Sequence, residues 1–349
     1  MCGIVGYVGS QAPSSRPLEV ALNGLKRLEY RGYDSAGVAL VAPGVDHVVS
    51  AKKAGKLLNL TAELEAHPLP DATASIGHTR WATHGAPNDL NAHPHLADGG
   101  RLAVIHNGIV ENFAALRVEL AADGVTFLSE TDTEVAAHLL AKELAETGDL
   151  TEAMRRTAVR LEGTFTLLAV HADRPDTVVG ARHDSPLVVG LGDGENFLGS
   201  DVAAFIAFTR EALELGQDQI ATITPDAVSV IDFEGAVVEP RRFTVDWDAD
   251  AAEKGGFASF MDKEIHDQPQ AVGDTLLGRT DLEGRLVLDD LRIDESVLRT
   301  VDKIVVIACG TAAYAGHVAK YAIEHWCRIP VEVELAHEFR YRDPVVNEK

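Results

Sequence analysis

The sequence contains few of the residues on which several protein classes depend. Only three of its 349 residues are cysteines (Cys2, Cys309 and Cys327), and no two of them form a CxxC pair. This spacing excludes a zinc knuckle and a disulfide framework and fits a reducing cytoplasm. Lysines and arginines number 31 against 54 aspartates and glutamates, so the chain lacks the basic face of a nucleic-acid-binding protein.

Long apolar runs are also missing. No stretch approaches the ~18 residues of a membrane-spanning helix. The N-terminus has no basic segment followed by an apolar core, as a signal peptide would have. We therefore expect a cytoplasmic protein with neither nucleic acid nor membrane as a partner.

The spacing of apolar residues predicts an α+β protein of two domains. Helices are predicted near 17–30, 112–122, 133–146 and 151–161, and strands near 3–9, 36–42, 47–52, 74–79, 101–106, 165–171, 177–181, 186–191, 219–223 and 227–232. Residues 241–258 are charged, show no clear period and indicate a linker.

The last part of the chain predicts the start of a second domain. A helix at 259–277 is followed by a strand at 303–308, a helix at 312–326 and a strand at 331–335. One such βαβ unit is too small for a parallel sheet, which needs more strands and cover on both faces. We therefore expect the chain to be a fragment of a longer protein.

Cys2 is the most informative residue of the sequence. If Met1 is removed, Cys2 carries both a thiol and a free α-amine, whose pKa of roughly 7.7–8.0 lets it act as a base near neutral pH. The alternative is an ordinary cysteine at the start of a buried strand.

Other polar residues in three short segments suggest what such a thiol could attack. Asn107 offers a side-chain NH₂ and Gly108 a backbone N–H to an oxyanion. Arg80 can bind a carboxylate, and Asp132 can bind an ammonium group. Together, Arg80 and Asp132 would recognise an amino acid, and the carbonyl near the thiol would belong to its side chain, as in glutamine.

Each of these residues also has a purely structural interpretation. Arg80 could pair with a surface acid, Asn107–Gly108 could form a turn, and Asp132 could cap a helix. Trp81 could belong to the core. A last alternative is a metal site, for which the sequence offers the histidines His84, His93, His95 and His106 but no carboxylate at ligand spacing.

These segments resemble those of the glutamine:fructose-6-phosphate amidotransferase family. The resemblance covers essentially the whole chain and rests on an ordered set of motifs: Cys2–Gly6, Leu28–Gly37 (LEYRGYDSAG), His78–Gly85 (HTRWATHG), Asn91–His95 (NAHPH), His106–Asn112, Ser129–Glu134, Met261–Pro269 and Ala308–Thr311. One of these motifs alone would be weak, whereas the ordered set is specific.

The resemblance implies an N-terminal-nucleophile glutaminase domain, a four-layer αββα sandwich, over residues 2–240. Cys2 matches the nucleophile, with its own α-amine as the base, and Asn107 and Gly108 match the oxyanion hole. The glutamine-binding positions are matched by Arg80, Trp81, Thr83, His84 and Asp132, and Trp81 also matches the family's gate on an ammonia channel.

Residues 259–349 resemble the start of a sugar isomerase domain, a doubly wound α/β fold. Cys309, Gly310 and Thr311 fit a loop whose backbone N–H groups bind the sugar phosphate at a helix N-terminus. Ala312 stands where family members often have serine, and the family's catalytic isomerase residues would lie beyond Lys349. This chain is therefore expected to lack the isomerase site.

The resemblance implies that Cys2 hydrolyses L-glutamine, and that the full-length enzyme uses the ammonia to aminate fructose 6-phosphate to glucosamine 6-phosphate. It implies no metal or other cofactor, and a homodimer when full length. The alternatives are a glutaminase-only fragment, a non-catalytic sugar-phosphate-binding protein and a metal-dependent amidohydrolase that uses the histidines.

Overall fold

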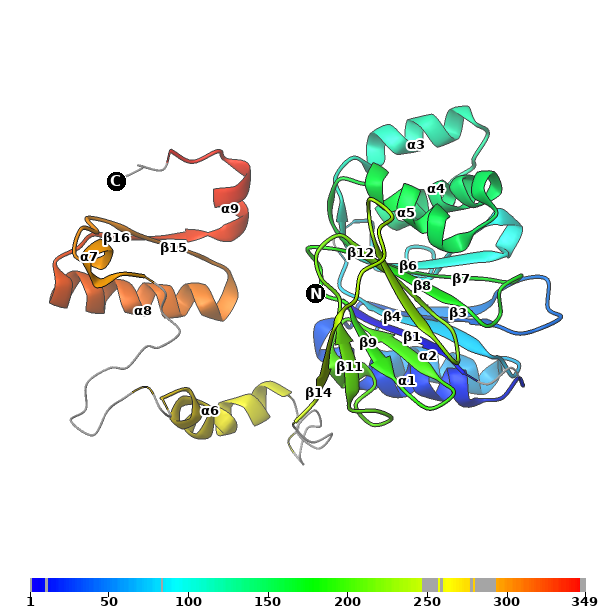
Figure 1. The fold of residues 1–349 in the computed structure, drawn as a ribbon, viewed down its shortest axis with the longest axis horizontal. Helices are drawn as coiled ribbons and strands as arrows, with labels where there is room; N and C mark the ends of the chain where they lie inside the picture. Colours follow the sequence, from blue (N-terminus) through cyan, green and yellow to red (C-terminus); the bar gives the residue numbers. More distant parts are fainter. Residues whose placement is uncertain are drawn as a thin grey trace. The chain divides into compact units, whose positions relative to one another are not determined.

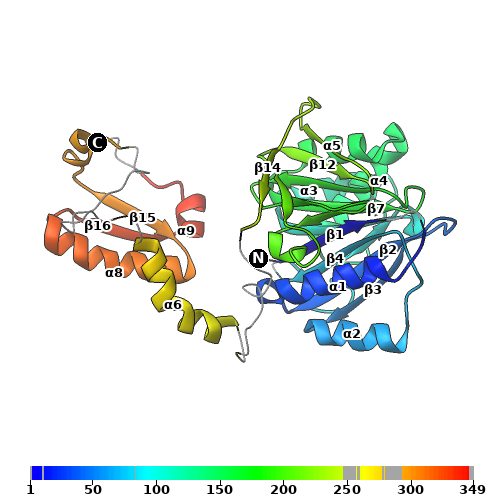
Figure 2. The same ribbon diagram turned by 60° about the horizontal axis from the view of Figure 1, so that its bottom comes forward.

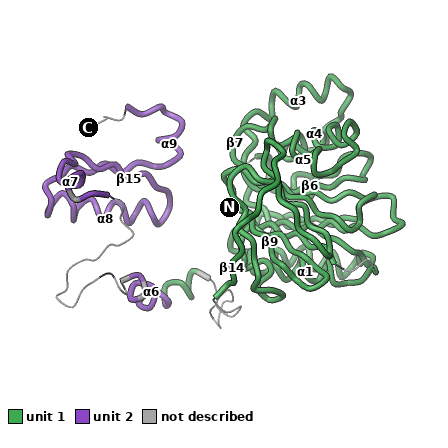
Figure 3. The backbone as a smooth tube through the Cα atoms, viewed as in Figure 1, with its two compact units in different colours: residues 1–265 green, residues 266–349 purple. Residues whose placement is uncertain are grey.

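A computed structural model describes residues 2–9, 12–82, 84–246, 257, 260–276, 279 and 293–345. The chain divides into two compact units, Met1–Ile265 and His266–Lys349, which Figure 3 shows in different colours. Among the described residues, no helix has the length and apolar character needed to cross a bilayer.

The first unit contains two β-sheets. One has eight strands in the order β14-β11-β9-β10-β1-β4-β2-β3, and the other has six in the order β13-β12-β8-β7-β6-β5. The strands of the first are β1 (Gly3–Val8), β2 (Ser35–Val41), β3 (Val49–Ala54), β4 (Ala74–Arg80), β9 (Val188–Leu191), β10 (Asn196–Gly199), β11 (Glu211–Glu214) and β14 (Arg241–Thr244). Those of the second are β5 (His95–Ala97), β6 (Leu102–Val110), β7 (Gly163–His171), β8 (Val178–His183), β12 (Gln219–Ile223) and β13 (Val228–Asp232).

Helices cover the outer face of each sheet and make four layers, αββα (Figures 1 and 2). Helices α1 (Arg16–Leu28) and α2 (Leu57–Ala66) pack on the eight-stranded sheet, and α3 (Phe113–Ala122), α4 (Asp132–Thr147) and α5 (Leu150–Arg160) lie over the six-stranded one. This is the fold expected from the resemblance.

The buried core follows these layers. One apolar cluster lies between the two sheets and includes Ile4 of β1, Ile105 of β6 and Leu168 of β7, all fully buried. Strands β1, β2 and β4 are covered on both faces and are therefore buried along their whole length. β1 and β2 are mainly apolar, whereas β4 also buries the polar side chains of Ser75, His78, Thr79 and Arg80.

Strand β1 lies in the interior of its sheet although it begins at the third residue. It pairs antiparallel with β4 on one side and with β10 on the other. The residue just before it, Cys2, is therefore held by strands whose sequences lie more than 70 residues away.

The predicted linker requires a correction at its start. Residues Arg241–Thr244, expected to begin the linker, form β14 and pair with β11. Their sequence alternates too briefly to indicate a strand, and only the exposed edge of β11 gives them a partner. Most of the remaining predicted linker, 247–256 and 258, lies outside the described residues.

The second unit contains the βαβ arrangement that the sequence predicts. Strands β15 (Ile304–Ala308) and β16 (Val331–Leu335) pair in parallel, and α8 (Gly310–Cys327) connects them. Helix α6 (Phe260–Leu276) spans the boundary between the units, and α7 (Glu295–Leu298) and α9 (Ala336–Tyr341) complete the described elements. Helix α8 begins at Gly310, so Cys309, Gly310 and Thr311 lie at its N-terminus as expected.

Candidate active site

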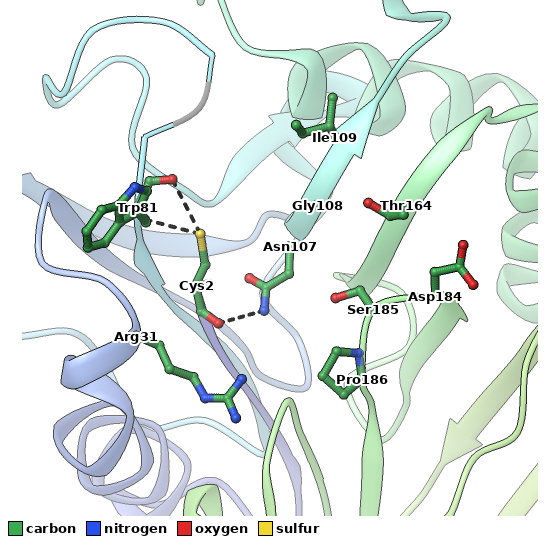
Figure 4. A pocket seen from close by; sticks show the side chains of 10 residues that line it. All are labelled: Cys2, Arg31, Trp81, Asn107, Gly108, Ile109, Thr164, Asp184, Ser185 and Pro186. Atoms are coloured by element: carbon green, nitrogen blue, oxygen red, sulfur yellow. Dashed lines mark hydrogen bonds between the residues drawn. The ribbon is translucent and has the colours of Figure 1, made fainter. Parts of the chain in front are cut away.

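The thiol of Cys2 lies at the end of β1 where that strand meets β4. Neighbouring backbone groups fix its position, since Gly3 N–H donates to Thr79 Oγ1 (3.2 Å) and Ile4 N–H to Ser200 Oγ (3.1 Å). Trp81, the first residue after β4, donates its backbone N–H to Cys2 Sγ at 3.1 Å, and the thiol faces Trp81 O at 3.6 Å (Figure 4).

The environment of the thiol favours its protonated form. Burial raises the pKa of Cys2, and the Trp81 N–H and the Arg80 charge oppose this shift only in part. A thiol with a raised pKa is a poor nucleophile at neutral pH, because the thiolate is the reactive species. Cys2 therefore needs a base that removes its proton during the reaction.

Asn107 approaches Cys2 from the other sheet. Its side-chain Nδ2 donates to the Cys2 carbonyl oxygen at 2.8 Å. Asn107 and Gly108 do not form the turn that the dipeptide suggests; they continue β6, opposite Thr166 and Phe165 of β7. Gly108 has φ +124°, and a Cβ there would lie 1.9 Å from the Thr164 carbonyl oxygen.

A cavity of about 360 Å³ opens beside the thiol. Cys2, Trp81, Asn107 and Gly108 line it together with six residues that the sequence did not identify: Arg31, Ile109, Thr164, Asp184, Ser185 and Pro186. Figure 4 shows the last four across the cavity from Cys2. Arg31 and Ile109 lie in family motifs and so carried a signal, whereas Thr164, Asp184, Ser185 and Pro186 come near only because β7 and β8 follow β6 in the sheet.

Arg80 lies next to this cavity without lining it. Its side chain is buried, not at the surface, and it donates to the carbonyl oxygens of His84 and Gly85. Its pKa is lowered by burial, and the charges of Cys2, Asp132 and Asp34 oppose that shift. Among the described residues, nothing accepts a hydrogen bond from Arg80 Nη1, and the Nδ1 atom of His84 is also unpaired.

A buried guanidinium nitrogen without an acceptor is costly, by about 1–3 kcal/mol. Such a group is expected where a ligand completes the hydrogen bonds. Arg80 Nη1 is therefore the observation in this structure that most directly indicates an anionic ligand.

Asp132 is the first residue of α4 and does not cap it, which corrects the alternative drawn from the sequence. The N-cap is Thr131, whose side chain accepts from Glu134 N–H. Asp132 Oδ2 instead accepts from Val110 N–H (2.9 Å) at the end of β6 and lies 3.9 Å from His106 Nδ1. Its buried carboxylate thus faces the strand that carries Asn107 and Gly108.

Of the other positions expected in the glutamine pocket, the structure describes Trp81 and His84 but not Thr83. Trp81 is 45% exposed and lies edge-on to Tyr33 (5.2 Å between ring centroids), so it is not a core residue. The His84 ring packs edge-on against Phe113. Thr83 lies outside the described residues.

The histidines of the metal alternative take part in hydrogen bonds and ring contacts. His106 Nδ1 bonds with Thr133 Oγ1 (3.0 Å), His95 Nε2 with Thr131 Oγ1 (2.9 Å), and His93 packs against His78. Within the described part of the chain, no three histidine, cysteine or acidic side chains are grouped as metal ligands.

Comparisons with known proteins agree with this architecture. A model of the glutamine amidotransferase domain matches residues 78–207, and a model of the SIS domain matches residues 297–349. Solved structures with a similar fold include a glutamine phosphoribosylpyrophosphate amidotransferase from B. subtilis, with a TM-score of 0.57 and 18% identity over 95% of this chain and 65% of that one. The chain thus contains a glutamine amidotransferase domain, with a fold like that of the solved amidotransferase.

The curated relatives identify the family more closely. Proteins named glutamine–fructose-6-phosphate aminotransferase [isomerizing] are 66% identical in Corynebacterium efficiens and 64% identical in Streptomyces coelicolor, in both cases over 100% of this chain. The chain belongs to this family of aminotransferases. It spans about half of the length of these relatives, 56%.

Proposed function

We propose that this chain hydrolyses L-glutamine to glutamate and ammonia at Cys2. The observation that carries the proposal is the meeting of three groups at one cavity: the Cys2 thiol, the Asn107 amide 2.8 Å from the Cys2 carbonyl, and Gly108. The buried Nη1 of Arg80, which has no acceptor among the described residues, supports an amino-acid substrate.

The thiol is the nucleophile of the proposed reaction. The α-amine of Cys2, free once Met1 is removed, takes the thiol proton, and Sγ bonds to the carbon of the substrate carboxamide. The oxyanion of the tetrahedral intermediate receives hydrogen bonds from Asn107 Nδ2 and Gly108 N–H. The carbon–nitrogen bond then breaks, ammonia leaves with the proton, and water hydrolyses the thioester to glutamate and the free thiol.

The remaining roles concern recognition. Arg80 binds the α-carboxylate of glutamine and Asp132 its ammonium group, while Trp81, Thr83 and His84 complete the pocket. The polar far side of the cavity, Asp184 and Ser185, lies where it can contact the substrate. No metal or other cofactor takes part in this scheme.

The relatives' printed name extends the proposal to the whole protein. In the full-length enzyme, the ammonia aminates fructose 6-phosphate to glucosamine 6-phosphate. Cys309, Gly310 and Thr311 at the N-terminus of α8 bind the sugar phosphate through backbone N–H groups. The cytoplasmic location and the homodimer implied by the sequence are part of this proposal.

An assay of glutamate release tests the proposal, with Cys2→Ala as the variant and Cys327→Ala as its control. Cys2→Ala should reduce hydrolysis to background while the protein stays folded, since the thiol makes no bond on which β1 depends. Cys327 is exposed in the other unit, so its loss should leave the rate unchanged.

The same samples test the role of the α-amine. Mass analysis of active wild-type protein should show Cys2 as the first residue. Hydrolysis that survives in Cys2→Ala would refute the nucleophile, and full activity in protein that keeps Met1 would refute the base. Amination of fructose 6-phosphate is measured in parallel with the full-length protein.

A further inference from the structure

The orientation of the Asn107 side chain is determined by its neighbours. The Cys2 carbonyl oxygen, 2.8 Å away, can only accept a hydrogen bond, so the amide atom facing it is the NH₂ group. The amide oxygen, Oδ1, therefore points to the other side, where it lies 3.0 Å from Nε2 of His78. His78 lies on β4 and Asn107 on β6, so this bond joins the two sheets directly behind the site.

His78 can hold that amide only if its proton is on Nε2. Its side chain is fully buried, and burial lowers the pKa of His78 to about 3, so the ring is neutral at physiological pH. A neutral imidazole has one N–H and one lone pair. A lone pair on Nε2 would face the lone pairs of Asn107 Oδ1, whereas an N–H there makes the hydrogen bond.

Two further observations agree with this tautomer. The other ring nitrogen of His78, Nδ1, makes no hydrogen bond of normal geometry among the described residues; a contact with the His106 backbone opposes the lowering of the pKa of His78 without reversing it. The second group near Nε2 is Nδ1 of His93, at 3.2 Å, with ring centroids 4.1 Å apart. This contact fits the tautomer when Nδ1 is the unprotonated nitrogen of the His93 ring.

We propose that His78 is a positioning residue for glutamine hydrolysis: its Nε2–H holds Asn107 Oδ1 and thereby keeps the Asn107 NH₂ group aimed at the oxyanion. Without that bond, only the Cys2 carbonyl holds the amide, which is then freer to turn its NH₂ group away from the developing negative charge. The bond also polarises the amide, which strengthens its NH₂ as a donor. His78 does not touch the cavity, and the inference rests on the function proposed above.

Two amide variants of His78 separate this role from a general structural one. Glutamine places an amide nitrogen near the position of Nε2, and asparagine places one near Nδ1. We expect His78→Gln to keep kcat within a few-fold of wild type. His78→Asn should lower kcat by 10- to 100-fold with little change in KM, because removing an oxyanion donor outright costs about 10²–10³-fold.

Two controls accompany the pair. His171→Asn changes another buried histidine, one bonded to Asp98 and not to Asn107, and should leave kcat unchanged. In an Asn107→Ala background, His78→Asn should cost almost nothing further, because residues that act as one unit are not additive. Thermal unfolding of every variant verifies that the compared proteins are folded.

The outcomes distinguish this inference from the proposed function. A wild-type protein that releases no glutamate would refute the function itself. If wild type is active, an unchanged kcat in folded His78→Asn, or a full additional loss on the Asn107→Ala background, would overturn the positioning role alone. Should His78→Asn fail to fold, a His78→Gln protein that folds but loses kcat would overturn it as well.

Discussion

At the scale of single residues, the backbone beside Asn107 adopts a conformation that only glycine reaches without strain. Gly108 has φ +124°, and its Cα faces the Thr164 carbonyl oxygen of the paired strand. The absence of a side chain lets β6 and β7 stay paired past the site, through Ile109 and Val110. The same close approach explains why a dipeptide typical of turns lies inside a strand.

Gly108→Ala should therefore destabilise the protein by at least ~3 kcal/mol, since the strained φ costs about 1–3 kcal/mol and the Cβ also overlaps a backbone oxygen. Glutamate release should be lost as well. Urea denaturation and the activity assay measure the two effects.

Gly124→Ala is the matched control for this substitution. Gly124 also has a positive φ, +93°, but a Cβ there meets nothing within 4 Å. Gly124→Ala should lower the free energy of unfolding by only about 1–2 kcal/mol, and the protein should keep full activity. Equal costs at the two positions would show that the contact with Thr164 is unimportant.

At the scale of elements, the start of α4 connects the helix layer to the polar residues behind the site. Thr131 Oγ1 accepts from Glu134 N–H and lies 2.9 Å from both His95 Nε2 and Ser129 Oγ. Glu134 in turn accepts from Ser129 N–H and Leu128 N–H. Asp132 directly follows Thr131, so this capping network fixes the position of Asp132 and directs its carboxylate toward β6.

Thr131→Ala should cost about 2 kcal/mol of unfolding free energy, at the upper end for an N-cap, because it also removes two buried hydrogen bonds. The control is Asp149→Ala at the N-cap of α5. In the described part of the chain its side chain accepts from Glu152 N–H alone, in an exposed position, so its loss should lower the free energy of unfolding by about 1 kcal/mol. A Thr131→Ala protein as stable as Asp149→Ala would contradict the network.

The sequence predicts elements well where an apolar pattern is long. The predicted helices near 17–30 and 133–146 correspond to α1 and α4, and the strand at 331–335 matches β16. Strands β5, β10 and β11 were missed because three or four residues are too few for a pattern. Helix α2 was missed although Leu57, Leu60 and Leu64 have helical spacing.

The residues of the site also divide into those that a sequence motif predicts and those that only the folding of the chain brings together. Cys2, Trp81, Asn107 and Gly108 were expected together and line one cavity. Thr164, Asp184 and Pro186 could not be predicted, because they belong to the site through strand order alone. The bond from His78 to Asn107 likewise requires the distance between two sheets, which no spacing along the chain contains.

At the scale of the whole molecule, four histidines are buried without charge. Burial lowers the pKa of each: His78 to about 3, His93 and His95 well below their usual value, and His106 in the same direction although Asp132 opposes it. All four become protonated more easily once the chain unfolds. The unfolded state therefore binds more protons than the folded state below about pH 6.5.

The stability of the folded protein should consequently fall as the pH drops below about 6.5. Each histidine contributes up to ~1.4 kcal/mol per pH unit, so the free energy of unfolding should decrease between pH 6.5 and 5.5 by up to ~4 kcal/mol, the value for four rings that stay unprotonated in the folded state. Urea denaturation at the two pH values measures it. A flat profile would show that the folded protein takes up these protons without cost.

Two variants test whether the four buried histidines cause this pH dependence of the free energy of unfolding. Replacing one of the four, as in His95→Gln, should reduce the pH dependence by about a quarter. Replacing His67, whose side chain is 77% exposed, should leave the pH dependence unchanged.

The interior place of β1 in its sheet sets an order of events during biosynthesis. β1 needs β10, residues Asn196–Gly199, as a neighbour, so the ribosome must add about 190 residues after the first strand emerges. At roughly 5–20 residues per second, this takes about 10–40 s. Throughout that interval the sheet cannot enclose the amino terminus, so the removal of Met1 that the proposed mechanism requires has time to occur before β1 is paired on both sides.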